Sequence, residues 1–416
     1  MTLFQITALL IVLAGVFGAI NYLVLRLPSA IGILVVSLVA SFGVIGVDAI
    51  FPKITLEETI RAGVLDLEFS DTLLEGMLGL LLFAGALHVK VSDLRAHWPV
   101  ILLMATIGVG ISTAIAGVGF SWITGAPLVI AMIWGALISP TDPVAVMGVL
   151  RTAKLNKPLE TAISGESLFN DGVGYVTFLL LVGLAFPNAN APHTSGFAEI
   201  AELFVVEALG GALLGIVLGF LTFRLMRQID ERSLGVLLTL GLAFGGYELA
   251  VYMGVSGPIA AVCAALMIGD VGPKHGMSEE TRSFVDSFWG IIDEILNAIL
   301  FLMIGIEVFA ITFSSDFFTA GVLAIGLSLL ARFLAVVLPI ILLRPFQKFS
   351  LGAVAIMTWG GLKGGVSVAL VLSMPDSEWK PIMLACTYMV VIFTIVVQGL
   401  TVAPLARKLG PEPELV

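Results

Sequence analysis

Apolar segments of about twenty residues, separated by short loops that carry most of the charges, make up nearly the whole sequence. A helix of about 20 apolar residues crosses the hydrocarbon layer of a bilayer, where only helices and closed barrels satisfy their own backbone hydrogen bonds. We therefore predict an all-α membrane protein with about 13 transmembrane helices and no soluble domain. The predicted segments are 3-25, 29-47, 73-91, 98-120, 125-149, 162-186, 199-226, 234-252, 255-270, 284-309, 317-343, 350-373 and 380-406.

The composition supports this class and excludes others. Hydrophobic residues make up 59% of the 416 residues and charged residues only 12%, which lies outside the range of soluble domains. The formal net charge of -10 argues against a nucleic-acid partner, because few cationic side chains are available to neutralise phosphates. A charged ligand of this chain is expected to be a cation.

The loops predict the orientation in the membrane. Most Lys and Arg residues lie in loops that follow odd-numbered segments, whereas loops after even-numbered segments hold only Lys53, Arg61 and Lys380. Short cytoplasmic loops collect basic residues. This alternation predicts a multi-pass protein of the cell (inner or plasma) membrane, with its N-terminus outside and its C-terminus in the cytoplasm.

A carboxylate lies between two prolines near the middle of segment 125-149, in the sequence SPTDP at 139–143. Neither Pro140 nor Pro143 has a backbone N–H, so the carbonyls of Ala136 and Ser139 lose their usual helical partners. We expect an unwound stretch around Asp142. A membrane protein tolerates such a stretch only inside protein or beside a water-filled cavity.

Segment 162-186 gathers a second set of polar side chains. Ser167 and Asp171 are four residues apart and share a helix face, as do Glu166 and Asn170, and the two faces adjoin. Oxygen ligands of this kind suit a hard cation, and the lack of a His or Cys cluster argues against zinc or copper. The alternative is that these polar groups only tie helices together by hydrogen bonds. One Asn or Ser would serve that purpose, whereas three carboxylates within thirty residues would not be needed for it.

A second interruption, WGGLKGG at 359–365, lies in segment 350-373. If segment 199-226 is a linker, the other twelve segments form two sets of six, and the broken helix is the fifth in each set. This correspondence is typical of inverted repeats, whose binding site lies where the two broken helices cross. Half-helix ends carry partial charges, which Asp142 and Lys363 are placed to offset. For Lys363, snorkelling or a packing break are the alternatives.

A charged residue inside the membrane needs a partner. Arg332 lies within the apolar segment 317-343, and we predict that it pairs with Glu166. Four other acids in apolar segments lack such motif context and are interpreted as structural: Glu248, Asp293, Glu294 and Glu307.

The sequence resembles the NhaP-type monovalent cation/proton antiporters, which are relatives of the sodium/proton exchangers. The resemblance rests on SPTDP at 139–143 and GESLFNDG at 165–172. It extends to VSGPIA at 255–260, FLMIG at 301–305, Arg332 and TWGGL at 358–362, in the expected order. Two positions depart from the family pattern: Lys363 stands where Arg is usual, and Ala84 follows Phe83 where many members carry an acid.

The resemblance implies a homodimer of antiporter-fold protomers that operate by alternating access. It implies a scaffold or dimerisation domain formed by 1-72 and 199-270, and a transport domain formed by 73-186 and 284-406. The expected activity is electroneutral 1:1 exchange of Na+ (or Li+ or K+) for H+, with no cofactor beyond the transported ions and no enzymatic reaction.

The resemblance also implies roles for individual residues. Asp171 would carry the exchanged cation or proton, and the Na+ site would comprise Asp142, the carbonyl of Thr141, Glu166, Ser167 and Asp171. Asn170 would orient the unwound strand, Arg332 would pair with Glu166, and Lys363 would support the site. Asn at position 170, where electrogenic relatives have Asp, implies exchange of one proton per cation.

Two other classes and one related activity are alternatives. A K+/H+ antiporter would use the same fold. An intramembrane aspartyl protease would use Asp142 and Asp171 as a proton-sharing pair, but the expected Gly-x-Gly-Asp setting is absent. A cation channel would need a filter-like ring of carbonyls or a repeated pore loop, and the sequence shows neither.

Overall fold

The computed structural model describes residues 3–51, 77–142, 157–186, 197–275, 278–310, 315–345 and 352–409, and the regular structure in these ranges is helical. Each of the thirteen predicted segments contains helix. The main helices are α1 (Leu3–Ile20), α2 (Ser29–Ile50), α5 (Leu78–Leu87), α6 (Val91–Leu103), α7 (Val109–Thr124), α8 (Leu128–Ile138), α10 (Lys157–Ala185), α11 (Phe197–Met226), α12 (Arg232–Tyr252), α13 (Gly257–His275), α14 (Glu279–Ile306), α15 (Ser315–Leu343), α16 (Ala353–Trp359), α17 (Gly365–Ser373), α18 (Lys380–Ile392) and α19 (Gly399–Leu409).

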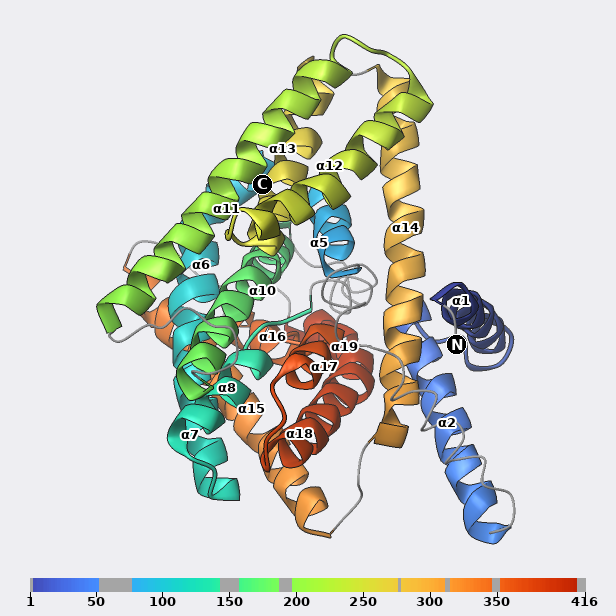
Figure 1. The fold of residues 1–416 in the computed structure, drawn as a ribbon, viewed down its shortest axis with the longest axis vertical. Coiled ribbons are helices and arrows are strands. Elements are labelled where there is room, and N and C mark those ends of the chain that lie inside the picture. The colour runs from blue at the N-terminus through green and yellow to red at the C-terminus, as the bar shows by residue number, and fades with distance from the viewer. Residues whose placement is uncertain are drawn as a thin grey trace.

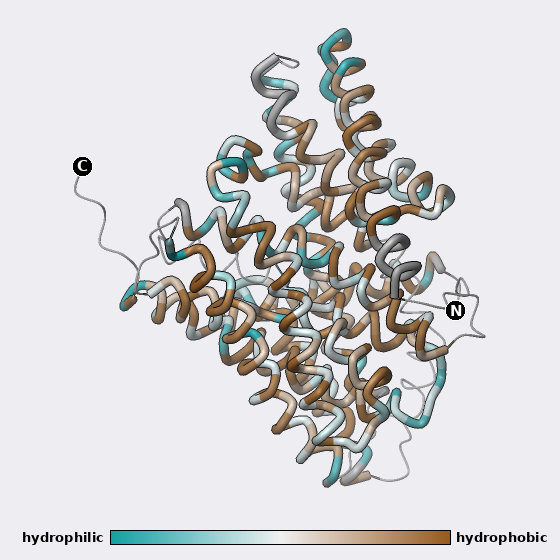
Figure 2. Tube along the Cα trace, turned by 90° about the vertical axis from the view of Figure 1, so that its left-hand side faces the viewer, coloured by the Kyte–Doolittle hydropathy of each residue, from teal (hydrophilic) through white to brown (hydrophobic). Residues whose placement is uncertain are grey.

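The helices have the length and polarity of membrane spans. Eight helical stretches in the described ranges are long and apolar enough to cross a bilayer, and three shorter apolar helices accompany them. Hydrophobic residues run along most of the long helices, and hydrophilic residues occupy several of their ends (Figure 2). The protein is therefore a multi-pass membrane protein, whereas the count of thirteen crossings stays a prediction.

The helices pack in two groups (Figure 1). The first group comprises α1, α2, α5 and α11–α14, and the second comprises α6–α8, α10 and α15–α19. Helix α14 packs against α2, α5 and α12 of its own group, and meets the second group chiefly at α17. The two groups also touch where α10 lies against α11 and α13.

Glycines let helices of the first group approach closely. A Cβ added at Gly211 of α11 would lie 2.5 Å from the carbonyl oxygen of Ser256, and one added at Gly215 would lie 2.2 Å from that of Ala260. Small residues are common at helix interfaces in membranes because they allow such approach. Gly219, one further turn along α11, also lies close to Ala264, so a row of glycines sets the α11–α13 contact.

The loop between α11 and α12 makes polar contacts with the start of α14. The Asp230 carboxylate accepts hydrogen bonds from the hydroxyls of Ser278 and Thr281 at 2.7 and 2.8 Å. The bond from Ser278 and then that from Thr281 lower the pKa of Asp230 below its ordinary value. Glu231 caps α12 by accepting from the backbone N–H groups of Ser233 and Leu234.

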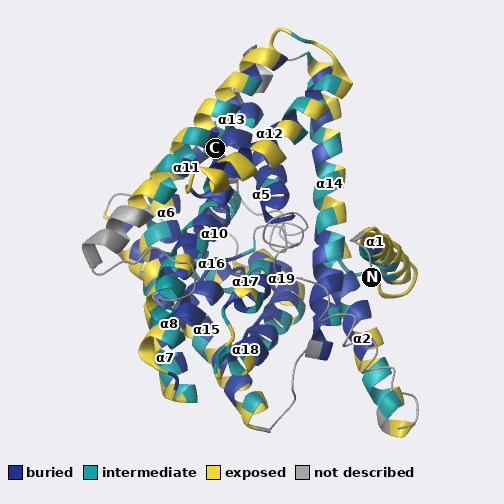
Figure 3. Cartoon of the chain, in the orientation of Figure 1, coloured by how far each residue is buried: buried dark blue, intermediate teal, exposed yellow. Residues whose placement is uncertain are grey.

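The buried core lies around α8, α10 and α17, and exposed residues lie on outward helices such as α1 and α11 (Figure 3). Buried aromatic side chains in the core satisfy their polar atoms. Trp134 donates its indole N–H to Thr387 at 3.1 Å, and Tyr388 of α18 donates its hydroxyl to the carbonyl of Ile304 in α14 at 2.7 Å. The Tyr388 bond connects the two groups of helices.

Candidate functional site

The two predicted helix breaks meet inside the second group. Helix α8 ends at Ile138, and the described part of the SPTDP sequence, 139–142, is not helical. Helix α16 ends at Trp359 and α17 begins at Gly365. The backbone N–H of Asp142 donates to the carbonyl of Leu362 at 2.9 Å, so the two breaks are in direct contact. The predicted crossing of two broken helices is confirmed, and Pro143 lies outside the described residues.

Lys363 caps the end of the opposite half-helix. Its ammonium donates to the carbonyls of Ser139 at 2.8 Å and Pro140 at 3.1 Å, and the side chain is buried. The Ser139 carbonyl is one that Pro143 leaves without a helical partner. A cation at the C-terminal end of α8 also offsets the partial negative charge there.

Asp142 occupies the complementary position at the start of α17. A Cβ added at Gly364 would lie 2.3 Å from Oδ2 of Asp142, so the carboxylate rests against the backbone that begins this half-helix. The N-terminal end of a helix carries a partial positive charge that favours an anion. Lys363, from the second break, thus offsets the end of α8, and Asp142, from the first break, offsets the start of α17. The sequence predicted this arrangement for both residues.

A hydrogen-bonded set of side chains joins α10 to the unwound segment. The Thr141 hydroxyl lies 2.9 Å from the Ser167 hydroxyl and accepts from the amide Nδ2 of Asn170 at 2.9 Å. The Asn170 Oδ1 accepts from the backbone N–H of Thr141 at 3.3 Å. All three side chains are buried, and the two hydrogen bonds to Thr141 connect Asn170 directly to the unwound segment.

A buried ion pair joins α10 to α15. Both guanidinium Nη atoms of Arg332 donate to the Glu166 carboxylate, Nη2 to Oε2 at 2.9 Å, and both residues are buried. The Nε and Nη2 atoms of Arg332 also donate to the Met357 carbonyl, at 3.2 and 3.1 Å. This bidentate pairing confirms the partner predicted for Arg332.

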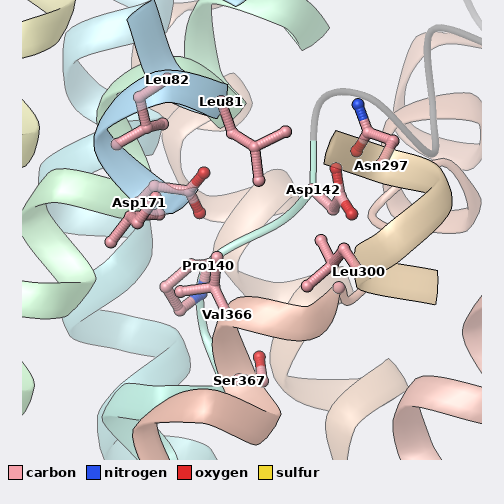
Figure 4. A pocket seen from close by; sticks show the side chains of 11 residues that line it. Leu81, Leu82, Pro140, Asp142, Asp171, Asn297, Leu300, Val366 and Ser367 are labelled. Carbon is pink, nitrogen blue, oxygen red and sulfur yellow. The ribbon is translucent and has the colours of Figure 1, made fainter. Parts of the chain in front are cut away.

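A cavity of about 30 Å³ lies where the crossing faces the first group (Figure 4). The crossing and α10 contribute Asp142 and Asp171 to its wall, and α17 contributes Ser367. Helices α5 and α14 close the other side with leucines and with Asn297. Polar oxygens and an apolar wall therefore meet at the boundary between the two groups.

The five residues predicted to bind Na+ occupy different places. Asp142 and Asp171 line the cavity, whereas Thr141 and Ser167 are not among its lining residues and lie with their hydroxyls 2.9 Å apart. Glu166 faces Arg332 and lines a separate, smaller space with Asn170. Across the described ranges, no group of three or more His, Cys, Asp or Glu side chains is arranged to hold a metal ion. The five-residue Na+ site stays a prediction.

Two further polar residues line the cavity and were not predicted from sequence. Ser367 lies two residues after the second break, and Asn297 lies in the apolar segment 284-309. An Asn within an apolar stretch, one turn after Asp293, is the signal that identifies Asn297 as a candidate. Ser367 offers no comparable signal, because small polar residues are common in membrane helices.

Comparison with known proteins gives consistent matches. Residues 8–408 match the family model described as "Sodium/hydrogen exchanger, transmembrane". The chain is 43% identical to the Na(+)/H(+) antiporter NhaP of Pseudomonas aeruginosa, over 97% of this chain and 96% of that protein. It is 34% identical to the Na(+)/H(+) antiporter NhaH of Halobacillus dabanensis, over 82% and 84% of the two chains.

A solved structure shows the same fold. The sodium proton antiporter MjNhaP1 of Methanocaldococcus jannaschii superimposes with a TM-score of 0.79, covering 98% of this chain and 99% of that one, at 20% sequence identity. The helix order and the crossing of broken helices described above therefore correspond to the antiporter fold.

Proposed function

Because the chain belongs to the sodium/hydrogen exchanger family, we propose that it exchanges one Na+ for one H+ across the cell membrane. The observation that carries this proposal is that Asp142 and Asp171 line one cavity at the crossing of the two broken helices. A Na+ ion and a proton compete there for the Asp171 carboxylate. Competition for one carboxylate couples the two fluxes without any chemical reaction.

The charges at the crossing support a ratio of one to one. Glu166 and Arg332 neutralise each other in their buried pair. The Lys363 ammonium lies at the same crossing as Asp142 and Asp171, and the formal charges of these three side chains sum to one negative charge. One proton or one Na+ neutralises that charge, so the two loaded forms are electrically equivalent. The empty form keeps a charge that is costly to move through the membrane.

The individual residues have different roles in this proposal. Asp171 binds Na+ or H+, and Asp142, the Thr141 carbonyl and Ser167 supply further oxygen ligands. Asn170 holds the unwound strand through its two bonds to Thr141, at 3.3 and 2.9 Å. The second group moves as a transport domain against the first group, which acts as the scaffold and the dimer interface of a homodimer, with the N-terminus outside.

This division differs from the sequence expectation at two helices. Residues 73-91 and 284-309 were expected in the transport domain, but α5 packs against α13 and α14, and α14 packs against α2 and α12. We therefore place α5 and α14 in the scaffold. The hydrogen bond from Tyr388 to Ile304 then joins the two domains and must break when they move.

Transport by purified protein in liposomes tests the proposal. Na+ should drive proton flux at a rate that an imposed membrane voltage leaves unchanged, because the loaded forms are neutral. An equal rate with K+ would favour the K+/H+ alternative, and cation current without proton movement would favour a channel. Cleavage of an added transmembrane peptide would favour the protease instead.

Replacement of Gly364 by Ala is expected to impair exchange without unfolding the protein. The new Cβ would displace the Asp142 carboxylate, which lies 2.3 Å from its position. Misplacement of about 1 Å at a reacting group costs on the order of 100-fold in rate, and we expect a loss of about tenfold to 100-fold. Gly326→Ala in α15 is the control, because a Cβ there meets nothing within 4 Å. Equal exchange rates for the two variants would contradict the placement of Asp142.

A further inference from the structure

The scaffold side of the cavity carries one polar side chain among those that line it in the described ranges. Leucines make up the rest of that wall: Leu78, Leu81, Leu82 and Leu300. Asn297 of α14 is only 5% exposed and lies across the cavity from Asp171 (Figure 4). A buried amide in an apolar wall is costly unless its polar atoms are used. The position of Asn297 therefore requires an explanation.

Asp293 fixes the orientation of this amide. The Nδ2 atom of Asn297 donates to the backbone carbonyl of Asp293 at 2.7 Å and to its Oδ1 atom at 3.0 Å. The reversed orientation would place the amide oxygen against these two oxygens, which cannot donate to it when the carboxylate is ionised. The amide nitrogen is thus directed back along α14, and the amide oxygen is directed toward Asp142 (Figure 4).

A neutral amide oxygen aimed at a carboxylate has a clear chemical use. Two acceptors do not bond to each other, but both coordinate a hard cation placed between them. Asp142, Asp171 and Ser367 supply oxygens from the transport side of the same cavity. A cation in the cavity would therefore be held from both sides.

We propose that Asn297 is a cation ligand supplied by the scaffold, positioned by Asp293, which binds the ion only while the cavity is assembled as in this structure. The proposal rests on the proposed function, because it assumes that a cation occupies this cavity. Asp142 and Asp171 travel with the transport domain, whereas Asn297 stays with α14. Movement of the domains separates Asn297 from the ion and leaves the carboxylates with it.

A ligand that contacts the ion in only one conformation affects the Na+ affinity measured from only one face of the membrane. Loss of Asn297 should weaken Na+ binding from the face to which this cavity opens, and should leave binding from the other face unchanged. A residue that merely stabilised the fold would alter both faces alike. The asymmetry therefore distinguishes a ligand from a structural residue.

The test is the apparent KM for Na+, measured from each face in liposomes of defined orientation. Asn297→Ala should raise the KM on one face by about threefold to tenfold, the factor expected for one polar interaction, and leave the other face at the wild-type value. Asp293→Ala should produce a smaller shift on the same face, because the amide loses its anchor. Leu296→Ala, a truncation on the same helix that does not line the cavity, should leave both values unchanged.

The outcomes separate this proposal from the function on which it rests. If the wild type exchanges Na+ for H+ and Asn297→Ala changes the KM on neither face, or on both faces equally, Asn297 is not such a ligand and the exchange mechanism stands. If the wild type shows no Na+-driven proton flux, the proposed function itself fails. Should Asn297→Ala not fold, Asn297→Ser, which keeps a shorter oxygen ligand, is judged by the same comparison between faces.

Discussion

Replacement of Asp171 by Asn is expected to abolish Na+-driven proton flux in proteoliposomes. The amide keeps the size of the side chain, but it has neither the negative charge that attracts Na+ nor the site that accepts the transported proton. Asp171 is the carboxylate that α10 presents to the cavity, opposite the unwound segment. We expect flux at the level of empty liposomes, with the protein still folded.

The control for this variant is Asp286→Asn. Asp286 lies on α14 in an exposed ion pair with Arg282, 3.6 Å apart, far from the crossing in the chain. The same carboxylate-to-amide change there should leave exchange at the wild-type rate. If Asp171→Asn retained Na+-driven flux, another group would have to carry the ion.

Replacement of Arg332 by Ala should be the most destabilising single change at the crossing. It leaves the Glu166 carboxylate buried without its cation and the Met357 carbonyl without its donors. Breaking a buried ion pair by removing one partner costs about 3–5 kcal/mol. We expect a low yield of folded protein and a lower melting temperature, measured without Na+ so that ion binding does not contribute.

A double variant separates the lost pair from other effects of the truncation. Glu166→Leu combined with Arg332→Met replaces both charges with apolar groups and should recover most of the lost stability. Arg282→Ala removes an exposed pair and should change stability by less than about 1 kcal/mol. A melting temperature for Arg332→Ala equal to that of Arg282→Ala would show that the buried pair does not stabilise the fold.

Local sequence chemistry predicted the two helix breaks. Prolines at 140 and 143 remove backbone donors, and glycines at 360, 361, 364 and 365 flank Lys363, so both interruptions follow from the residues at the break. The partner of Arg332 was predictable for a related reason. A charge inside the membrane must be compensated, and Glu166 lies in the polar cluster of segment 162-186.

Tertiary packing decided what the sequence did not predict. Asn297 and Ser367 line the cavity only because α14 and α17 meet there, and no pattern within either segment indicates that contact. Our proposal that α5 and α14 belong to the scaffold depends on which neighbours they pack against. Likewise, the bidentate contact of Arg332 places Glu166 away from the cavity, whereas helix periodicity alone put it beside Asp171.

The claim that one carboxylate site serves both ions is tested most directly by proton release on Na+ binding. Na+ added to purified protein in a weakly buffered detergent solution, at a pH where Asp171 is protonated, should release protons in proportion to the Na+ bound. One proton per Na+ is expected at saturation, and none from Asp171→Asn. Na+ binding without proton release, or the same release from the Asp171→Asn variant, would contradict it.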